Sequence, residues 1–134
     1  MIKALLETGF LLALNPRDRN HEWATRVLNE AKKHKIIIFL SPASLIELSL
    51  ILKSRGLTDP EISQVFDALN SLIKPKPSYP ELTAETLSSA ARLRTRYPEL
   101  SFFDSIHAAL TLENDLAYYD LDDVVLHVVE SERG

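Results

Sequence analysis

The sequence predicts an α/β protein built around a mostly parallel sheet of four to five strands, with helices on both faces. Three observations indicate this class. Short apolar runs alternate along the chain with longer segments whose apolar residues recur every three or four positions. The 134 residues allow one domain with a substantial core, expected to span 1–134. No internal repeat or linker-like tract interrupts this alternation, so its elements are expected to pack as one layered unit.

The composition excludes several functional classes. The formal net charge of −4 argues against the broad basic surface of a typical DNA-binding module. The absence of cysteine excludes disulfides, zinc–thiolate sites and a cysteine nucleophile. No apolar run approaches the roughly 20 residues that span a bilayer, and the short apolar stretch before Glu7 does not form a signal peptide. We therefore expect no membrane segment and a cytoplasmic location.

The first half of the chain is expected to hold two strands, each followed by helices. The expected elements are strand 2–6, helical turns at 10–14, helix 21–35, strand 36–40, and helices 42–54 and 58–74. Trp23 and Val27 lie four residues apart, as on the apolar face of a helix. Ser41 and Pro42 offer a hydroxyl N-cap followed by proline at the first helical position. Thr58 opens a capping box for the next helix.

The second half continues the alternation. The expected elements are a weak edge strand at 78–82, helices 83–96 and 101–114, and strands 116–119 and 124–129. Pro80 restricts the weak strand to an edge of the sheet because proline cannot donate a ladder hydrogen bond. Thr83 and Ser101 are hydroxyl N-caps for the two helices. The run 124–129 is rich in valine, which favours a strand.

Several acidic residues follow the expected strands directly. Binding sites of parallel sheets form outside the carboxyl ends of the strands. Glu7 follows the first strand, and Asp120 follows strand 116–119 with Asp122 close behind. Glu47 lies in the second turn of the helix after strand 36–40. Taken one at a time, Glu7, Asp120 and Asp122 are also explained as a strand end and a solvated turn.

Glu47 is harder to explain as a structural residue. Its helix is apolar nearly all round, and no basic residue shares its helical row. A buried carboxylate without a partner costs several kcal/mol unless it is paired or bound to metal. We therefore interpret Glu47 as a functional residue.

Asp104 supports two interpretations. Its helix runs back toward the opposite edge of the sheet, so it joins the other acids only if the preceding loop brings the helix start there. The spacing of Ser101 and Asp104 also matches a capping box, which explains the acid equally well. His107, one turn later, lies among apolar residues and is more simply a hydrogen-bonded core or rim histidine than a metal ligand.

Five segments together resemble the PIN-domain family, of the toxin–antitoxin (VapC-type) ribonuclease kind. They are Ala4–Leu12 with its strand, acid and Thr-Gly, His21–Ala24, Ser41–Glu47, Leu100–Leu110 around Asp104, and Tyr118–Asp122. Their order and spacing cover nearly the whole chain. The resemblance implies a three-layer sandwich and a ribonuclease that depends on Mg²⁺ or Mn²⁺.

The resemblance also implies which residues hold metal and substrate. The catalytic and metal-binding set implied by the family is Glu7, Glu47, Asp104 and Asp120, with Asp122 as the alternative fourth ligand. Thr8 and Ser101 are candidates to orient water or phosphate, besides their local roles. Arg92 and Arg96 share a helix face and could contact RNA phosphates, although a solvated helix face explains them as well.

Two departures from the family pattern leave an alternative open. Glu7 stands where the family has aspartate, and its extra methylene moves the carboxylate by roughly one bond length. Asp123 stands where an aromatic residue usually follows the closing aspartates. The alternative is therefore a weakly active or inactive PIN module that binds RNA or acts as a scaffold. A third possibility is a Mg²⁺-binding receiver-like regulator, although no phospho-acceptor aspartate or downstream lysine is evident.

Toxin-type relatives imply two protein partners. One is a small antitoxin that inserts a segment into a groove, and the other is a second copy of the chain in a homodimer. The apolar face formed by Ile62, Val65, Phe66, Leu69 and Leu72 could serve such a contact or belong to the core.

Overall fold

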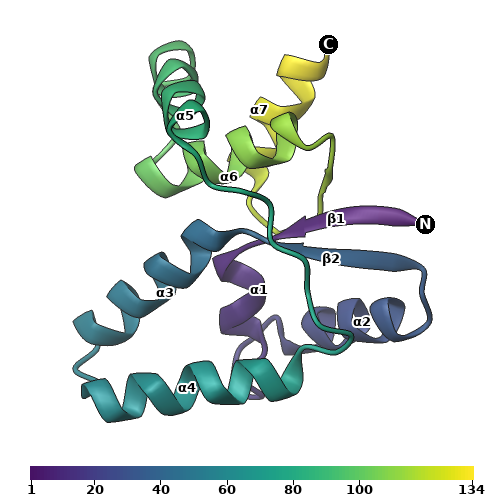
Figure 1. Cartoon of the computed structure of the whole chain (residues 1–134), viewed down its shortest axis with the longest axis vertical. Helices are drawn as coiled ribbons and strands as arrows, with labels where there is room; N and C mark the ends of the chain where they lie inside the picture. The colour runs from purple at the N-terminus through teal and green to yellow at the C-terminus, as the bar shows by residue number, and fades with distance from the viewer.

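A parallel three-stranded sheet lies at the centre of the computed structural model, which describes residues 1–134. Its strands are β1 (Ile2–Leu6), β2 (Ile36–Leu40) and β3 (Ala117–Tyr118), in the order β2-β1-β3 (Figure 1). Leu6 is in register with Leu40, and Leu5 with Tyr118. The carboxyl ends of all three strands therefore meet at one edge, with β1 in the middle.

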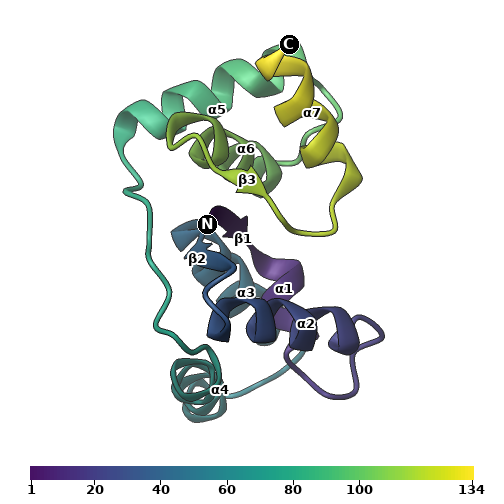
Figure 2. The same cartoon turned by 90° about the vertical axis from the view of Figure 1, so that its right-hand side faces the viewer.

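Helices cover both faces of this sheet, as Figure 2 shows. The helices of one layer are α1 (Thr8–Ala13), α2 (His21–Lys32), α3 (Pro42–Ser54) and α4 (Asp59–Leu72). Those of the other layer are α5 (Ala84–Arg96), α6 (Phe102–Glu113) and α7 (Asp123–Arg133). An extended segment runs from α4 past the sheet to α5 and joins the two layers (Figure 2). The predicted α/β sandwich with helices on both faces is confirmed.

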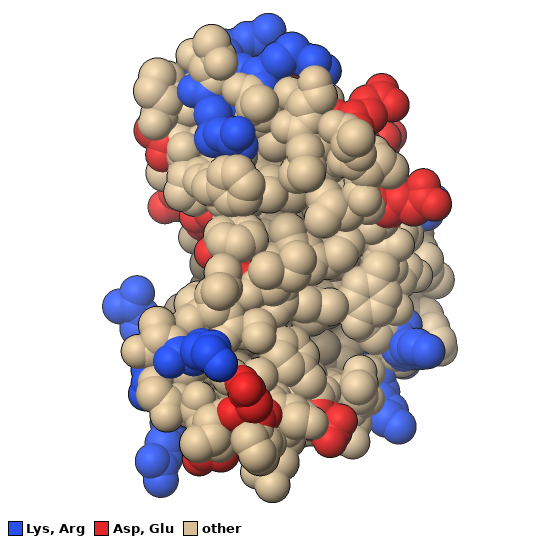
Figure 3. All heavy atoms as spheres, turned by 60° about the vertical axis from the view of Figure 1, so that its left-hand side comes forward, with Lys and Arg blue, Asp and Glu red and all other residues tan.

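The surface carries no single broad basic face on the side shown in Figure 3. Lys and Arg side chains gather toward the two ends of the molecule, over the two helical layers. Between them the surface is indented at the left edge of the view, and Asp and Glu atoms are visible there. None of the helices is both long and apolar enough to cross a membrane.

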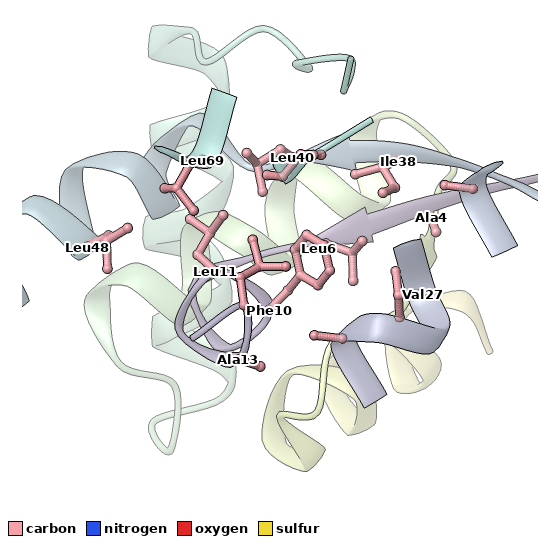
Figure 4. Close-up of a cluster of buried hydrophobic side chains, with 14 of the residues drawn as sticks. Ala4, Leu6, Phe10, Leu11, Ala13, Val27, Ile38, Leu40, Leu48 and Leu69 are labelled. Atoms are coloured by element: carbon pink, nitrogen blue, oxygen red, sulfur yellow. The ribbon is translucent and has the colours of Figure 1, made fainter. Parts of the chain in front are cut away.

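Two hydrophobic cores lie on opposite faces of the sheet. Because side chains alternate along a strand, Ala4 and Leu6 of β1 belong to one core and Leu5 to the other. Figure 4 shows the first core, in which Phe10 of α1 lies among side chains from the sheet and the surrounding helices. The Trp23 ring packs edge-on against Phe10 with centroids 6.1 Å apart. The predicted apolar face of α2 is therefore in the core.

The predicted strand 124–129 is wrong, because this segment is part of helix α7. Asp122 caps that helix: its Oδ1 accepts the backbone N–H groups of Val124 and Val125. Val125, Val128 and Val129 are buried in the second core at helical spacing. The sheet therefore has three strands instead of four to five. Strand propensity was overridden by an N-cap and by packing of one helix face.

The weak strand expected at 78–82 is reduced to a single residue. Ser78 forms a bridge with Phe39 at the edge of β2, exchanging backbone hydrogen bonds of 2.9 and 2.8 Å with Ile38 and Leu40. No ladder continues beyond it. The short strand expected at 116–119 is present as β3, over two residues.

Candidate active site

The carboxyl edge of the sheet positions the acids that the sequence singled out. Glu7 directly follows β1, the central strand. Ser41 follows β2 and leads into α3, which carries Glu47 in its second turn. Asp120 and Asp122 follow β3. The topology of parallel strands thus places residues from three distant parts of the sequence at one edge.

Asp104 reaches the same place from the start of α6. Leu100 is buried in the second core immediately before this helix, which fixes where the helix begins. The Ser101 hydroxyl then accepts the backbone N–H of Asp104 at 3.2 Å. The N-cap interpretation of Ser101 is therefore correct, and it coexists with a position for Asp104 beside the other acids.

Two overlapping groups of side chains form the centre. In one, single oxygen atoms of Glu7, Asp104 and Asp122 all lie within 4.8 Å of one another. In the other, single atoms of Glu7, Glu47 and His107 do the same. Glu7 is common to both groups and is only 6% exposed.

The surroundings of Glu7 disfavour the ionised form of its carboxyl group. The pKa of Glu7 is raised to about 7: burial is the largest cause, His107 opposes it, and the neighbouring Asp120, Asp104 and Glu47 add to it. The Tyr118 hydroxyl donates a hydrogen bond of 3.2 Å to Glu7 Oε2. Burial likewise raises the pKa of Asp104, partly offset by its hydrogen bond with Ser101. Carboxylates grouped in this way could hold a divalent cation, which would lower the cost of ionising them together.

Glu47 is held from two sides by hydrogen bonds. The Thr8 hydroxyl donates a hydrogen bond to Glu47 Oε1, and His107 Nε2 lies 3.3 Å from the same oxygen. Burial raises the pKa of Glu47, but the hydrogen bonds from His107 and Thr8 outweigh it, so that the pKa is lowered. Glu47 is therefore a fixed carboxylate that remains ionised, and Thr8 orients it.

His107 lies behind the acids, fully buried. Its Nδ1 is 2.7 Å from the buried hydroxyl of Ser41, while Nε2 faces Glu47 and lies 3.8 Å from Glu7 Oε2. Burial lowers the pKa of His107, but its hydrogen bond with Glu47 and the charges of Glu7, Glu47 and Asp104 outweigh burial, so that the pKa is raised. His107 is expected from the sequence to be a hydrogen-bonded core or rim histidine because of its apolar neighbours, and these contacts agree with that expectation.

Asp120 and Asp122 have different surroundings. The Asp120 carboxylate accepts three backbone N–H groups, from Glu7 at 2.9 Å, Phe10 at 3.1 Å and Leu121 at 2.9 Å. It therefore fixes the turn between β1 and α1, and it is absent from the group of three carboxylates. Asp122 uses only Oδ1 for its helix cap and belongs to that group. The sequence favours Asp120 as the fourth ligand, with Asp122 as the alternative; the structure groups Asp122, and not Asp120, with Glu7 and Asp104.

Gly9 allows Asp120 to come this close. A Cβ atom at Gly9 would collide with Asp120 Oδ1. The backbone of Gly9 is ordinary helix, so the lack of a side chain matters for space and not for conformation. The Thr-Gly pair after Glu7 is explained by these contacts: Thr8 holds Glu47, and Gly9 makes room for Asp120.

The arginines expected to contact RNA lie elsewhere. Arg92 donates to Ser88 and Ser89 on its own helix, and Arg96 is paired with Glu132 at 2.8 Å. Neither contacts an acid of the centre. Arg94 points to another side of α5, where its Nη1 donates a hydrogen bond of 2.6 Å to Ser105 Oγ. Arg94 was placed by the sequence on the same helix as Arg92 and Arg96, but its direction depends on the packing of α5 on α6, which the spacing does not show.

The fold and this centre define an α/β protein with a partly buried group of carboxylates at the carboxyl edge of a parallel sheet. Over residues 4–127 the chain matches the model of the PIN domain family, and it belongs to that family. Among curated proteins, no sequence matches this chain.

Solved structures share the fold over nearly the whole chain. One is VapC20 of Mycobacterium tuberculosis, described as a toxin that cleaves the sarcin-ricin loop. It is 21% identical, with a TM-score of 0.69 over 91% of this chain and 92% of that one. Another is FitAcB of Neisseria gonorrhoeae, 17% identical, with a TM-score of 0.62 over 95% of this chain and 93% of that one. The predicted family is confirmed, and with it the receiver-like alternative is excluded.

Proposed function

We propose that this chain is a divalent-metal-dependent ribonuclease that hydrolyses RNA phosphodiester bonds, as the toxin component of a toxin–antitoxin pair. The observation that carries the proposal is the group formed by Glu7, Asp104 and Asp122, whose oxygens lie within 4.8 Å of one another around a nearly buried Glu7. Membership in the PIN domain family supports it, as does the fold shared with VapC20, which is described as an RNA-loop-cleaving toxin.

The donor set fits Mg²⁺ or Mn²⁺. All three side chains offer carboxylate oxygens, the ligands that these hard cations prefer. The raised pKa values of Glu7 and Asp104 support the same conclusion, because a bound cation removes the cost of ionising both. When bound, such an ion supplies a Lewis acid for the scissile phosphate and a water molecule of lowered pKa.

The acids and their neighbours would have distinct roles in binding the ion and in positioning its ligands. Glu7, Asp104 and Asp122 hold the ion, and Glu47 faces the site from α3. His107 and Thr8 keep Glu47 ionised and oriented through their hydrogen bonds. Asp120 keeps the β1–α1 turn in place through its three backbone hydrogen bonds. Ser101 fixes the start of the helix that carries Asp104.

The longer side chain of Glu7 favours the alternative, a PIN module that binds RNA without cutting it. Against this alternative, the Glu7 carboxylate lies within 4.8 Å of both Asp104 and Asp122 in spite of the extra methylene. The hydroxyl of Tyr118 holds its Oε2 in that position. We therefore favour the active enzyme.

The antitoxin partner is also proposed, with its segment lying along the apolar groove between α1, α3 and α4. Leu12, Leu52, Val65 and Leu72 line this groove, and Arg17 and Arg55 are part of its wall. Of the apolar α4 face expected to bind a partner, Ile62 and Leu69 are buried in the core, whereas Leu72 is half exposed. A homodimer stays a prediction of the family resemblance.

The test is cleavage of a mixed RNA pool by purified protein with Mg²⁺ or Mn²⁺. The native chain should cut RNA, EDTA should abolish cutting, and Asp104→Asn should lower the rate at least about a hundredfold. Asp67→Asn, an exposed acid on α4, is the matched control and should cut normally. If the native chain is inactive but Glu7→Asp cuts RNA, the binding module is the correct function. Metal-independent cutting by Asp104→Asn would contradict both.

A further inference from the structure

We propose that Arg94 and Phe102 form a nucleotide subsite beside the carboxylates, in which Phe102 stacks on an unpaired base and Arg94 contacts a backbone phosphate. The subsite deepens the proposed function, on which the choice of RNA as ligand rests. It commits the enzyme to single-stranded segments of RNA, because a base inside a duplex is not free to stack on a side chain.

Arg94 is a fixed cation without an acidic partner. Its Nη1 donates to Ser105 Oγ at 2.6 Å, and the hydroxyl of this fully buried serine in turn donates to the Phe102 carbonyl at 2.6 Å. Of the other arginines of α5 and α7, Arg96 pairs with Glu132 and Arg133 with Asp115, and Arg92 donates to two serines of its own helix. No carboxylate lies within ion-pair distance of Arg94, and only one of its five N–H donors is in use.

The positive charge of Arg94 is therefore available to an anion. The protein carries a net charge of −4, and the nearby centre is acidic, so a phosphodiester needs a local cation in order to approach. An arginine with free N–H groups matches the geometry of phosphate oxygens. We therefore expect Arg94 to contact RNA, in place of Arg92 and Arg96.

Phe102 is an exposed ring that is nevertheless held in place. It is 58% exposed, more than any other large hydrophobic side chain except Met1. The Arg94 guanidinium lies 4.9 Å from its ring centroid, and the Phe103 ring packs edge-on at 5.6 Å. Single exposed hydrophobic residues are common and need no function. An exposed ring fixed by a cation differs, because it offers a rigid surface to a base at small entropic cost.

Both side chains converge on the first turn of α6, which also carries Asp104. Phe102 precedes Asp104 by two residues, and Arg94 is bonded to Ser105, which follows it. The pair thus lies within one helical turn of Asp104, and a strand of RNA with a phosphate at the carboxylates could extend to it. This position favours RNA over a protein as the occupant, because one strand can reach both features at once.

The test measures binding of a labelled single-stranded oligoribonucleotide to the Asp104→Asn protein with Mg²⁺ present, so that cutting does not interfere. Adding Phe102→Ala should weaken binding about tenfold or more, whereas Phe102→Trp should preserve it. Adding Arg94→Gln should weaken binding and reduce the salt slope by about one. Leu87→Ala and Arg26→Gln, exposed residues outside the site, are the matched controls and should change nothing.

Three outcomes overturn the subsite. The first is that the oligonucleotide does not bind, and the second is that Phe102→Ala and Leu87→Ala bind it equally well. The third is that Phe102→Ala weakens binding of the single strand and binding of the same sequence as a duplex by the same factor. If the chain does not bind RNA but Phe102→Ala abolishes binding of a protein partner, the surface is a binding site for that partner. Cleavage by the native chain is measured in parallel. If the native chain cuts RNA and Phe102→Ala binds it normally, only the subsite is rejected. If binding depends on Phe102 but the native chain does not cut RNA, only the nuclease activity is rejected.

Discussion

Glu7 is the residue at which the sequence departs from its family pattern. Its carboxyl group is also costly to ionise, because it is buried beside other acids. It is buried between a tyrosine hydroxyl, a histidine and three other acids. Its backbone N–H donates to Asp120, which fixes the backbone from which the side chain extends. The cost of ionising Glu7 makes the stability of the metal-free protein depend on pH.

We predict that the metal-free protein loses stability as pH rises from 5 to 8. Because the folded protein binds the Glu7 proton more tightly, its contribution is fully present below the ordinary pKa of 4.5 and is lost as pH passes the folded value of about 7. The contribution is up to about 3 kcal/mol. Glu7→Gln should remove this part of the pH dependence and raise Tm above the native value at pH 8.

The measurement is thermal unfolding in EDTA at several pH values, with Glu85→Gln as an exposed control. Asp104 and Asp120 also have raised pKa values, so the quantity of interest is the difference between native and variant. Mg²⁺ should stabilise the native protein at pH 8 and Glu7→Gln much less. Parallel curves for native and Glu7→Gln would contradict the environment described for Glu7.

At the scale of elements, helix starts were easier to predict than the last strand. Hydroxyl caps at Ser41, Thr58, Thr83 and Ser101 predicted helices that begin one residue later in the structure. Thr58, Thr83 and Ser101 each accept a local backbone N–H, which depends on a few adjacent residues. Ser41 makes no capping hydrogen bond, because its hydroxyl contacts His107 instead. The valine-rich segment of α7 failed because strand propensity competes with burial, and burial is decided by the rest of the chain.

We predict that Gly9→Ala destabilises the protein by about 1–3 kcal/mol, although alanine is the better helix former at this position. The new Cβ collides with Asp120 Oδ1 and displaces the carboxylate that binds the Glu7 and Phe10 amides. Denaturant unfolding of Gly9→Ala, Asp120→Ala and the double variant forms a mutant cycle. In the Asp120→Ala background the cost of Gly9→Ala should disappear. An unchanged cost there would show that Gly9 is needed for another reason.

At the scale of the whole molecule, the sequence predicted the two helical layers around a parallel sheet. Glu7 was singled out by its place after a strand, Glu47 by its apolar helix, and Asp104 by the family resemblance, and the structure brings all three to one edge of the sheet. The choice between Asp120 and Asp122 was not accessible, because it depends on which carboxylate accepts backbone N–H groups of a distant turn. The direction of Arg94 was missed for a similar reason, since it follows from how α5 packs on α6.

The central claim is that Glu7, Asp104 and Asp122 together hold a divalent ion. Titration of the metal-free protein with Mn²⁺, followed by calorimetry or by the Mn²⁺ electron-spin signal, tests it most directly. The account predicts saturable binding that Asp122→Asn weakens at least about tenfold, while the exposed neighbour variant Asp123→Asn binds as the native chain does. Equal affinities for all three proteins, or no saturable binding by the native chain, would contradict it.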